Sequence, residues 1–137
     1  TEYNQLTTLE NLNDMFYYNN STGVIKTNTN QLRNIGKIEK IQIVANELKN
    51  TKIRIALSTD SKHIYLKFDG TNWDEVQEND VINNGNTINE INNLTDQDFS
   101  SLDLTNKTLD FMICMETSDT TITPSIEKII ITSLNRE

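Results

Sequence analysis

The chain has 137 residues, of which 35% are hydrophobic and 23% are charged, and its formal net charge is −8. That length is enough for roughly one domain, and 17 isoleucines beside one proline and four glycines exclude a collagen-like, linker-like or wholly disordered chain. No apolar run approaches the roughly 18 residues that a membrane-spanning helix needs. We therefore expect a single β-rich domain over residues 1–137. Because the chain begins with threonine, we also expect that this domain was excised from a longer protein.

Acidic residues are concentrated in the second half of the chain. Residues 1–69 contain nine Lys/Arg and seven Asp/Glu (+2), whereas residues 70–137 contain three and thirteen (−10), which together give −8. A nucleic-acid binder needs a basic stripe that displaces counterions from phosphates, and anionic membranes attract basic segments in the same way. The sequence has no such stripe, so we expect no nucleic-acid partner and no membrane insertion. We interpret the acidic half as a solvated surface.

The first third of the chain gives weak structural signals. Residues 1–12 are polar except for leucines at a spacing of three, which favours a short helix packed on the body or a frayed extension. Short strands are expected next, at 15–18, 24–27 and 31–35. A turn cluster at residues 19–23 separates the first two of them.

Three segments with strict alternation of apolar and polar residues follow, at 40–45, 53–58 and 64–68. Alternation with a period of two is typical of half-buried strands, and short turns between them predict a meander. The side chains predicted to face the core are Ile41, Ile43, Ala45, Ile53, Ile55, Leu57, Ile64, Leu66 and Phe68. Tyr65 and Lys67 are then expected on the opposite, polar face, and residues 73–76 can form a hairpin with this third strand.

Residues 79–104 form a polar, asparagine-rich connection. Within it, Thr95 precedes Asp98 by three residues and Thr87 precedes Glu90 by three, which is the spacing of a helix capping box and predicts one or two short helices. Two strong strands, 109–117 and 126–134, close the chain. About eight strands with only minor helix predict an all-β antiparallel sandwich or jelly roll.

Cys114 is the only cysteine. It cannot form an intramolecular disulfide, and no Cys/His cluster offers a metal site, so we expect no metal and no cofactor. Alternation places Cys114 with Met112 on the face opposite the strand's larger apolar residues. We expect this face to be covered by the 79–104 connection or by a partner subunit, with slow thiol labelling as the consequence.

The sequence offers little support for catalysis. It has no glycine-rich phosphate loop, GxSxG, HExxH or EF-hand motif, and its single histidine, His63, is predicted at a strand edge without a linked nucleophile. Carboxylates flank the strands at Asp60, Asp69, Asp74, Glu75, Asp110 and Glu116, but no pair is singled out. We therefore expect that the protein is not an enzyme.

The predicted hairpin is the better functional candidate. Sugars present an apolar ring face that stacks on aromatic side chains, beside polar groups that bond the hydroxyls. The residues that combine these properties within one turn are Tyr65, Lys67, Asp69, Asn72 and Trp73. If the hairpin forms, Trp73 could lie across from Tyr65 or Lys67. The alternative is that Trp73 plugs the end of the sandwich as a core residue.

The segment TKIRIALSTDSKHIYLKFDGTNWDEV, residues 51–76, resembles a recurrent segment of bacteriophage tail and phage-tail-like particle proteins. In that family a strand of the type TKIRF is followed by a hairpin of the type WxxYDGxxW. The resemblance continues through NTINEINNLTDQDF (86–99) and through TLDF (108–111) to the strand after Pro124, and it covers about the last 85 residues. One departure is that this chain has Ile64 and Tyr65 where the family often has tryptophan, which makes an aromatic platform thinner.

The resemblance implies a non-enzymatic structural or attachment module of a phage tail, a baseplate or a related secreted particle of a low-GC Gram-positive host. The implied partners are other tail or baseplate subunits, with cell-surface carbohydrate and a homo-oligomer as further candidates. The implied location is the virion tail or an extracellular particle. Two alternatives stay open at this point: a carbohydrate-binding module of a secreted bacterial protein, and an accessory domain of a small hydrolase.

Overall fold

A computed structural model describes residues 2–19, 21–27, 34–102, 104 and 107–136. The strands are β1 (Glu2–Leu9), β2 (Tyr17–Asn19), β3 (Thr22–Lys26), β4 (Ile35–Asn46), β5 (Thr51–Ser58), β6 (Tyr65–Phe68), β7 (Trp73–Val76), β8 (Asp110–Thr117) and β9 (Ser125–Arg136). The helices are the 3₁₀ turns η1 (Leu12–Met15) and η2 (Glu78–Asp80) and the short α-helices α1 (Val81–Asn84), α2 (Ile88–Asn92) and α3 (Asp96–Phe99). None of the described helices is long and apolar enough to cross a membrane.

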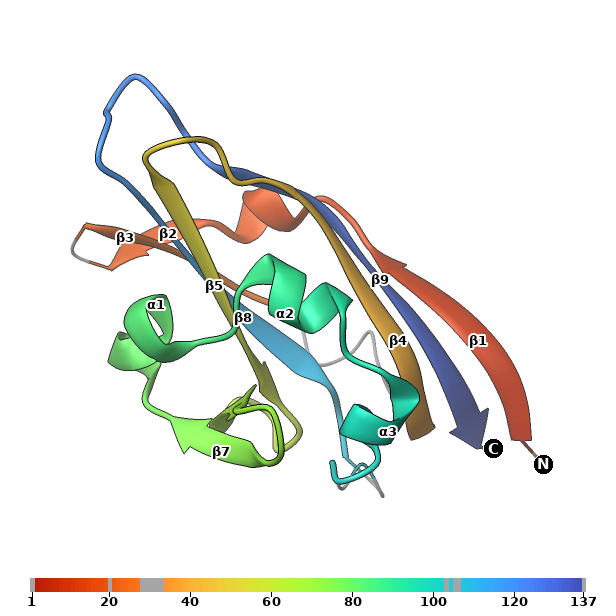
Figure 1. Cartoon of the computed structure of the whole chain (residues 1–137). Helices are drawn as coiled ribbons and strands as arrows, with labels where there is room; N and C mark the ends of the chain where they lie inside the picture. Colours follow the sequence, from red (N-terminus) through yellow and green to blue (C-terminus); the bar gives the residue numbers. More distant parts are fainter. Residues whose placement is uncertain (1, 20, 28–33, 103, 105–106, 137) are drawn as a thin grey trace.

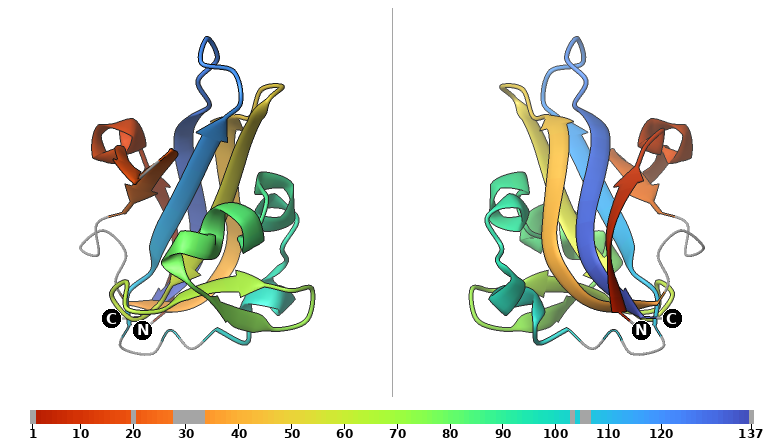
Figure 2. Two further views of the ribbon diagram at one scale, coloured as in Figure 1. Left: turned by 90° about the vertical axis from the view of Figure 1, so that its left-hand side faces the viewer. Right: turned by 90° about the vertical axis from the view of Figure 1, so that its right-hand side faces the viewer.

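The strands form two antiparallel sheets that face each other (Figures 1 and 2). The smaller sheet has the order β1-β9-β4, and the larger has the order β2-β3-β8-β5-β6-β7. The predicted all-β sandwich with minor helix is therefore confirmed, with nine strands among the described residues. The predicted strand at 31–35 falls largely on residues outside the described ones, and β4 begins at Ile35.

The main core lies between the two sheets and is built from the alternating residues predicted to point inward. Ile41, Ile53, Ile55 and Leu57 are fully buried, and Ile43 is 3% exposed. Burial of each such side chain stabilises the folded state by roughly 1.5–3 kcal/mol. Phe99 of α3 and Ile91 of α2 join the same core, so these helices close one side of the sandwich. Ile64 is an exception to the predicted pattern, because it lies before β6 and is exposed.

A second core lies on the outer face of the larger sheet, beneath α1. Its members are Val24, Ala56, Tyr65, Val76, Val81, Ile82, Met112 and Cys114. Cys114 is buried, as predicted, and the cover comes from the 79–104 connection. Burial raises the pKa of its thiol to about 12. The prediction that Tyr65 lies on a polar face was wrong, because α1 covers that face and leaves Tyr65 only 1% exposed.

Two predicted elements need correction. Residues 1–12 do not form a helix or a frayed extension, because β1 pairs with β9 along its whole described length. The spacing of three arises because Leu6 points outward from β1, Leu9 points into the core and Leu12 begins the buried turn η1. The 79–104 connection contains three α-helices where one or two were expected. The additional helix, α1, has no side-chain cap and therefore left no capping signal.

Candidate functional site

The β6–β7 hairpin predicted from the sequence forms, with Tyr65 opposite Val76 and Phe68 opposite Trp73. Asp69 closes its turn, because one carboxylate oxygen accepts the backbone N–H groups of Thr71 at 2.8 Å and Asn72 at 2.7 Å. Gly70 follows with a φ of 102°, a left-handed conformation that glycine adopts without steric strain. The tip of the hairpin is therefore a pre-organised turn.

Asn86 fixes the connection between α1 and α2 against the hairpin. Its backbone N–H and C=O pair with Ile55 of β5, both at 2.8 Å. Its side-chain oxygen accepts the N–H of Phe68, and its side-chain amide donates to the Phe68 carbonyl, both at 2.8 Å. One buried asparagine thus joins β5 and β6 at the point where their ladder ends, since the two strands pair only at Leu57 and Leu66.

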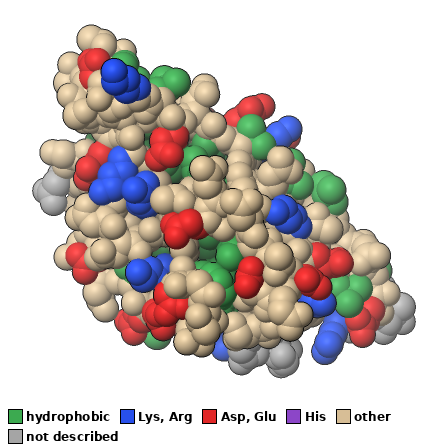
Figure 3. Space-filling model, viewed as in Figure 1, with side chains coloured by type: hydrophobic (Ala, Val, Ile, Leu, Met, Phe, Trp, Pro, Cys, Tyr) green, Lys and Arg blue, Asp and Glu red, His purple; other side chains and the backbone are tan. Residues whose placement is uncertain are grey.

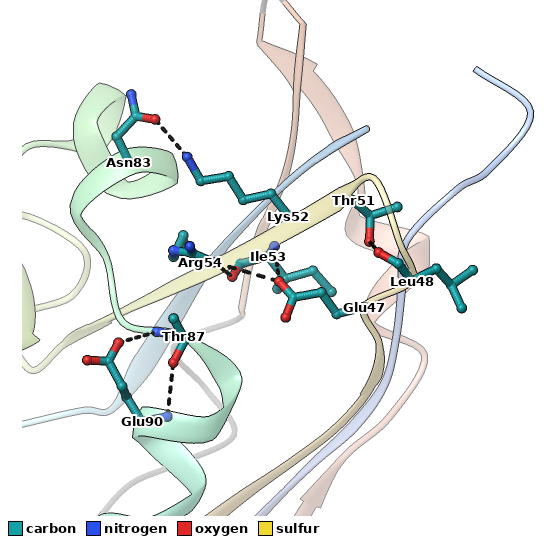
Figure 4. A network of polar contacts seen from close by, with 9 residues as sticks. All are labelled: Glu47, Leu48, Thr51, Lys52, Ile53, Arg54, Asn83, Thr87 and Glu90. Atoms are coloured by element: carbon teal, nitrogen blue, oxygen red, sulfur yellow. Dashed lines mark hydrogen bonds and ion pairs between the residues drawn. The ribbon is translucent and has the colours of Figure 1, made fainter. Parts of the chain in front are cut away.

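Side chains of β5 and the helices hold this connection from its other side (Figure 4). Lys52 Nζ donates to Asn83 Oδ1 of α1 at 2.8 Å. The predicted capping box at the start of α2 is confirmed, with Glu90 N donating to Thr87 Oγ1 and Thr87 N donating to Glu90 Oε1. The second predicted box, Thr95 with Asp98, also forms and begins α3. These contacts hold Glu90 in place beside the hairpin.

A cleft of about 410 Å³ lies between the hairpin tip and the α1–α2 connection. This volume is within the usual range of small-ligand sites, roughly 300–1,000 Å³. We call it the amide cleft. It is lined by Lys67, Phe68, Asp69, Gly70, Asn84, Gly85, Asn86, Glu90, Asn93 and Leu94. It therefore combines one ammonium, two carboxylates and three carboxamides with the apolar surface of Phe68 and Leu94.

Two carboxamides of the amide cleft are available to a ligand. Within the part of the chain that the structure describes, the side chains of Asn84 and Asn93 make no hydrogen bond, and both residues are exposed. Each offers an N–H donor and a carbonyl acceptor. A molecule with many hydroxyl groups, which donate and accept at once, matches this set better than a purely anionic or cationic ligand does.

Charges of both signs meet at the hairpin. Backbone N–H groups of Asn72 and Thr71 lower the pKa of Asp69, and the neighbouring Asp69 carboxylate raises the pKa of Asp74. Lys67 lies opposite Asp74 in the ladder. Figure 3 shows acidic and basic side chains interspersed over the face that carries the helices, without a field of one sign. The cleft is therefore polar without being strongly electropositive or electronegative.

The structure separates the five predicted sugar-binding residues. Lys67 and Asp69 line the amide cleft, and Asn72 lies exposed in the turn. Tyr65 is buried in the second core. Trp73 lies opposite Phe68, not opposite Tyr65 or Lys67.

Trp73 is half-buried and packs on the main core. Its ring centroid is 5.1 Å from that of Phe68 and 5.9 Å from that of Phe99. Its indole N–H donates to the Asp98 carbonyl at 2.9 Å. These contacts match the alternative in which Trp73 plugs the end of the sandwich.

The other titratable candidates serve the fold. Asp60 accepts hydrogen bonds from Ser58 and from the N–H groups of His63 and Ile64, and it stabilises the turn before β6. His63 is exposed, with its ring Nδ1 2.6 Å from the Asp60 carbonyl. Glu116 accepts from the hydroxyl of Thr22 at 3.0 Å. Among the described residues, no three His, Cys, Asp or Glu side chains are arranged to hold a metal ion.

Sequence reasoning missed the residues of the connection that line the amide cleft, Asn84, Asn86, Glu90, Asn93 and Leu94. The capping box at Thr87 placed α2 correctly, but nothing in the sequence indicated that the connection folds back onto the hairpin. Comparison of the chain with protein-family models, curated proteins and solved structures gives no match.

Proposed function

We propose that this chain is a non-enzymatic attachment module of a phage tail or phage-tail-like particle, and that it binds cell-surface carbohydrate through the amide cleft. The observation that carries the proposal is the pair of exposed carboxamides, Asn84 and Asn93, that face a ligand-sized cleft without a hydrogen-bond partner among the described residues. The sequence resemblance over residues 51–134 supplies the particle context, with other tail or baseplate subunits as partners.

Carbohydrate is favoured over other ligand classes by the chemistry of the cleft. Half of its polar side chains are uncharged amides, which suit hydroxyl groups, and Phe68 supplies aromatic surface for a sugar ring. A polyanion would meet the carboxylates of Asp69 and Glu90. The cleft is open, so a single site binds weakly, and the many copies of a tail protein in one particle would strengthen attachment. A carbohydrate-binding module of a secreted bacterial protein would use the same chemistry.

The proposal is tested with a tetravalent fusion of the full chain on an array of bacterial surface glycans and on purified cell walls of low-GC Gram-positive bacteria. We expect the wild-type fusion to bind and an Asn84→Ala/Asn93→Ala variant to lose about tenfold or more in apparent affinity, since each side chain supplies about 1 kcal/mol of hydrogen bonding. Asn89→Ala is the matched control, because Asn89 is an exposed asparagine of α2 outside the cleft. No binding by the wild type, or equal binding by the double variant, would contradict the proposal.

A further inference from the structure

A second concave surface lies at the other end of the sandwich from the amide cleft. It has a volume of about 180 Å³ and lies where β2 meets the end of β8 and the loop that leads into β9. β8 ends opposite the first residue of β5, whereas the β6–β7 hairpin follows the last, and Figure 1 shows the β8–β9 loop and the hairpin far apart. We call this surface the tyrosine cleft. Its lining shares no residue with that of the amide cleft and includes Phe16, Tyr18, Glu116, Thr120, Thr123 and Pro124.

Tyr18 gives the tyrosine cleft an exposed aromatic ring. It is 70% exposed, more than any other large hydrophobic residue that the structure describes. A single exposed apolar side chain is ordinary on a protein surface. A binding role therefore requires that the ring is held in a fixed orientation and that suitable polar groups surround it.

The orientation of the Tyr18 ring is fixed by Phe16. The two ring centroids are 4.9 Å apart and the ring planes are 87° apart, which is a favourable edge-to-face contact. Phe16 in turn lies directly on Gly23, where a Cβ atom would be 2.3 Å from the ring carbon Cε2. Tyr18 pairs with Gly23 in the β2–β3 ladder, so its backbone is held as well. A ring that is already ordered loses little conformational entropy when a ligand stacks on it.

The β8–β9 loop, which forms another wall of the cleft, is held by its own hydrogen bonds. Asp119 Oδ1 accepts the backbone N–H of Thr121 at 2.9 Å and its hydroxyl at 2.7 Å. The backbone N–H of Ser118 donates to the Asn50 carbonyl at 2.9 Å. Pro124 is buried at the end of the loop, and its ring restricts the backbone there. The cleft is therefore formed before any ligand binds.

The polar groups of the cleft have free hydrogen-bonding capacity. Glu116 accepts the Thr22 hydroxyl through Oε1 at 3.0 Å, and its Oε2 has no partner among the described residues. The hydroxyls of Thr120 and Thr123 are exposed and make no hydrogen bond within the described part of the chain. A carboxylate accepts hydrogen bonds, and a hydroxyl both donates and accepts them. No lysine or arginine stands among the described lining residues, so an anionic ligand would meet the Glu116 carboxylate without a balancing cation.

We propose that the tyrosine cleft is a second carbohydrate site, in which one uncharged sugar ring stacks on Tyr18 and donates a hydroxyl hydrogen bond to Glu116. The cleft is smaller than the roughly 300–1,000 Å³ of sites for drug-sized ligands, which suits a single ring of a polysaccharide. A hydroxyl that donates to a carboxylate forms a charge-assisted bond, which is stronger than a neutral one. A proline-rich peptide also packs on aromatic side chains, but its proline nitrogens offer no N–H to Glu116. The proposal rests on residues of the tyrosine cleft alone and does not depend on the amide cleft.

The test is an NMR titration of the full chain, labelled with ¹³C in its aromatic rings and with ¹⁵N, using uncharged oligosaccharides released from low-GC Gram-positive cell walls. We expect saturable shifts of the Tyr18 ring signals and of the Thr120 and Thr123 amides. Tyr18→Ala should raise the dissociation constant at this site by about tenfold or more and change the melting temperature little, because Tyr18 is mostly exposed. Tyr17→Ala is the matched control, since Tyr17 is a 44% exposed tyrosine of the same strand outside the cleft lining, and it should bind like the wild type.

The Asn84→Ala/Asn93→Ala variant separates the two sites. In this variant the Tyr18 shifts should persist with an unchanged dissociation constant. Shifts of the Asn84 and Asn93 side chains without shifts of Tyr18 would overturn the proposal and leave the amide cleft standing, whereas shifts at Tyr18 alone would do the reverse. Equal weakening by Tyr17→Ala and Tyr18→Ala would also overturn it, as would saturable binding of a proline decamer at Tyr18 with no binding of the oligosaccharides.

Discussion

Asp110 is a carboxylic acid that is fully buried at the start of β8. The Thr27 hydroxyl donates to its Oδ1 at 3.1 Å and accepts the N–H of Phe111 at 2.9 Å. Its Oδ2 has no hydrogen-bond partner among the described residues. Burial raises the pKa of Asp110, against the smaller opposing effects of the Thr27 hydroxyl and the Lys62 ammonium.

This raised pKa predicts a pH dependence of stability. The folded protein holds the Asp110 proton more tightly than the unfolded chain, so the associated stability is fully present below the ordinary value of 3.8 and is lost as the pH rises through the folded-state pKa. Asp110→Asn removes this titration. In urea titrations at about pH 3 and about pH 8, the free energy of unfolding of the variant relative to the wild type should increase with pH.

Asp119→Asn serves as the control for this experiment. Asp119 is a half-buried acid in the β8–β9 loop, and hydrogen bonds from Thr121 lower its pKa, so its effect on the free energy of unfolding changes with pH in the opposite direction. A difference between wild type and Asp110→Asn that is the same at both pH values would contradict the account.

Trp73 of the β6–β7 hairpin packs against α3, and this environment predicts a role in stability. Trp73→Ala removes contacts with Phe68 and Phe99 and should lower the free energy of unfolding by about 3 kcal/mol, the lower end for a large aromatic residue. Trp73→Phe keeps an aromatic ring in place and loses the hydrogen bond to Asp98, so this variant should lower the free energy of unfolding by about 1 kcal/mol. Thermal melting monitored by circular dichroism measures both changes. Equal melting temperatures for Trp73→Ala and the wild type would show that the ring is not part of the core.

The connection between α1 and α2 packs directly against β5. Gly85 allows this close approach because it has no side chain. A Cβ atom on Gly85 would lie 2.7 Å from the Val81 carbonyl oxygen and 3.0 Å from the Ile55 carbonyl oxygen. Both neighbours are backbone atoms, which move only with their elements. Gly85→Ala should therefore lower the free energy of unfolding by about 1–3 kcal/mol and shift the amide signals of the cleft. Unchanged stability and unchanged amide signals would show that the connection lies farther from β5.

The elements predicted well from the sequence are those in which local pattern and tertiary contacts agree. Alternation placed Ile41, Ile53 and Ile55 inward, and these residues form the main core. The capping boxes of α2 and α3 are local interactions, so their spacing was visible in the sequence. Alternation correctly placed Tyr65 on the sheet face opposite Leu66 and Phe68. The prediction that this face is polar was wrong because α1, a separate element later in the chain, covers it.

Of the two sides of the amide cleft, only the hairpin side was predicted from the sequence. The hairpin half, with Lys67 and Asp69, follows from a turn of four consecutive residues. The other half depends on Asn86 replacing a strand neighbour of Phe68, a contact between residues 18 positions apart. β1 was missed for the same reason, because its strand character depends on pairing with β9 at the opposite end of the chain.

On the scale of the whole molecule, asparagine side chains join the helical connection to both sheets. Asn92 pairs with the backbone of β4, and Asn86 pairs with the backbone of β6 (Figure 2 shows the helices on this side of the sandwich). The amide cleft thus lies where the helical connection meets the larger sheet.

The central claim is that the amide cleft binds carbohydrate, and a heteronuclear NMR titration tests it most directly. The ¹⁵N-labelled full chain is titrated with soluble fragments of a Gram-positive surface polysaccharide. We predict saturable shifts of the side-chain amide signals of Asn84 and Asn93 and of the backbone amide of Gly70, with Asn89 unchanged. Shifts confined to residues outside the cleft, or none at saturating glycan, would contradict the account.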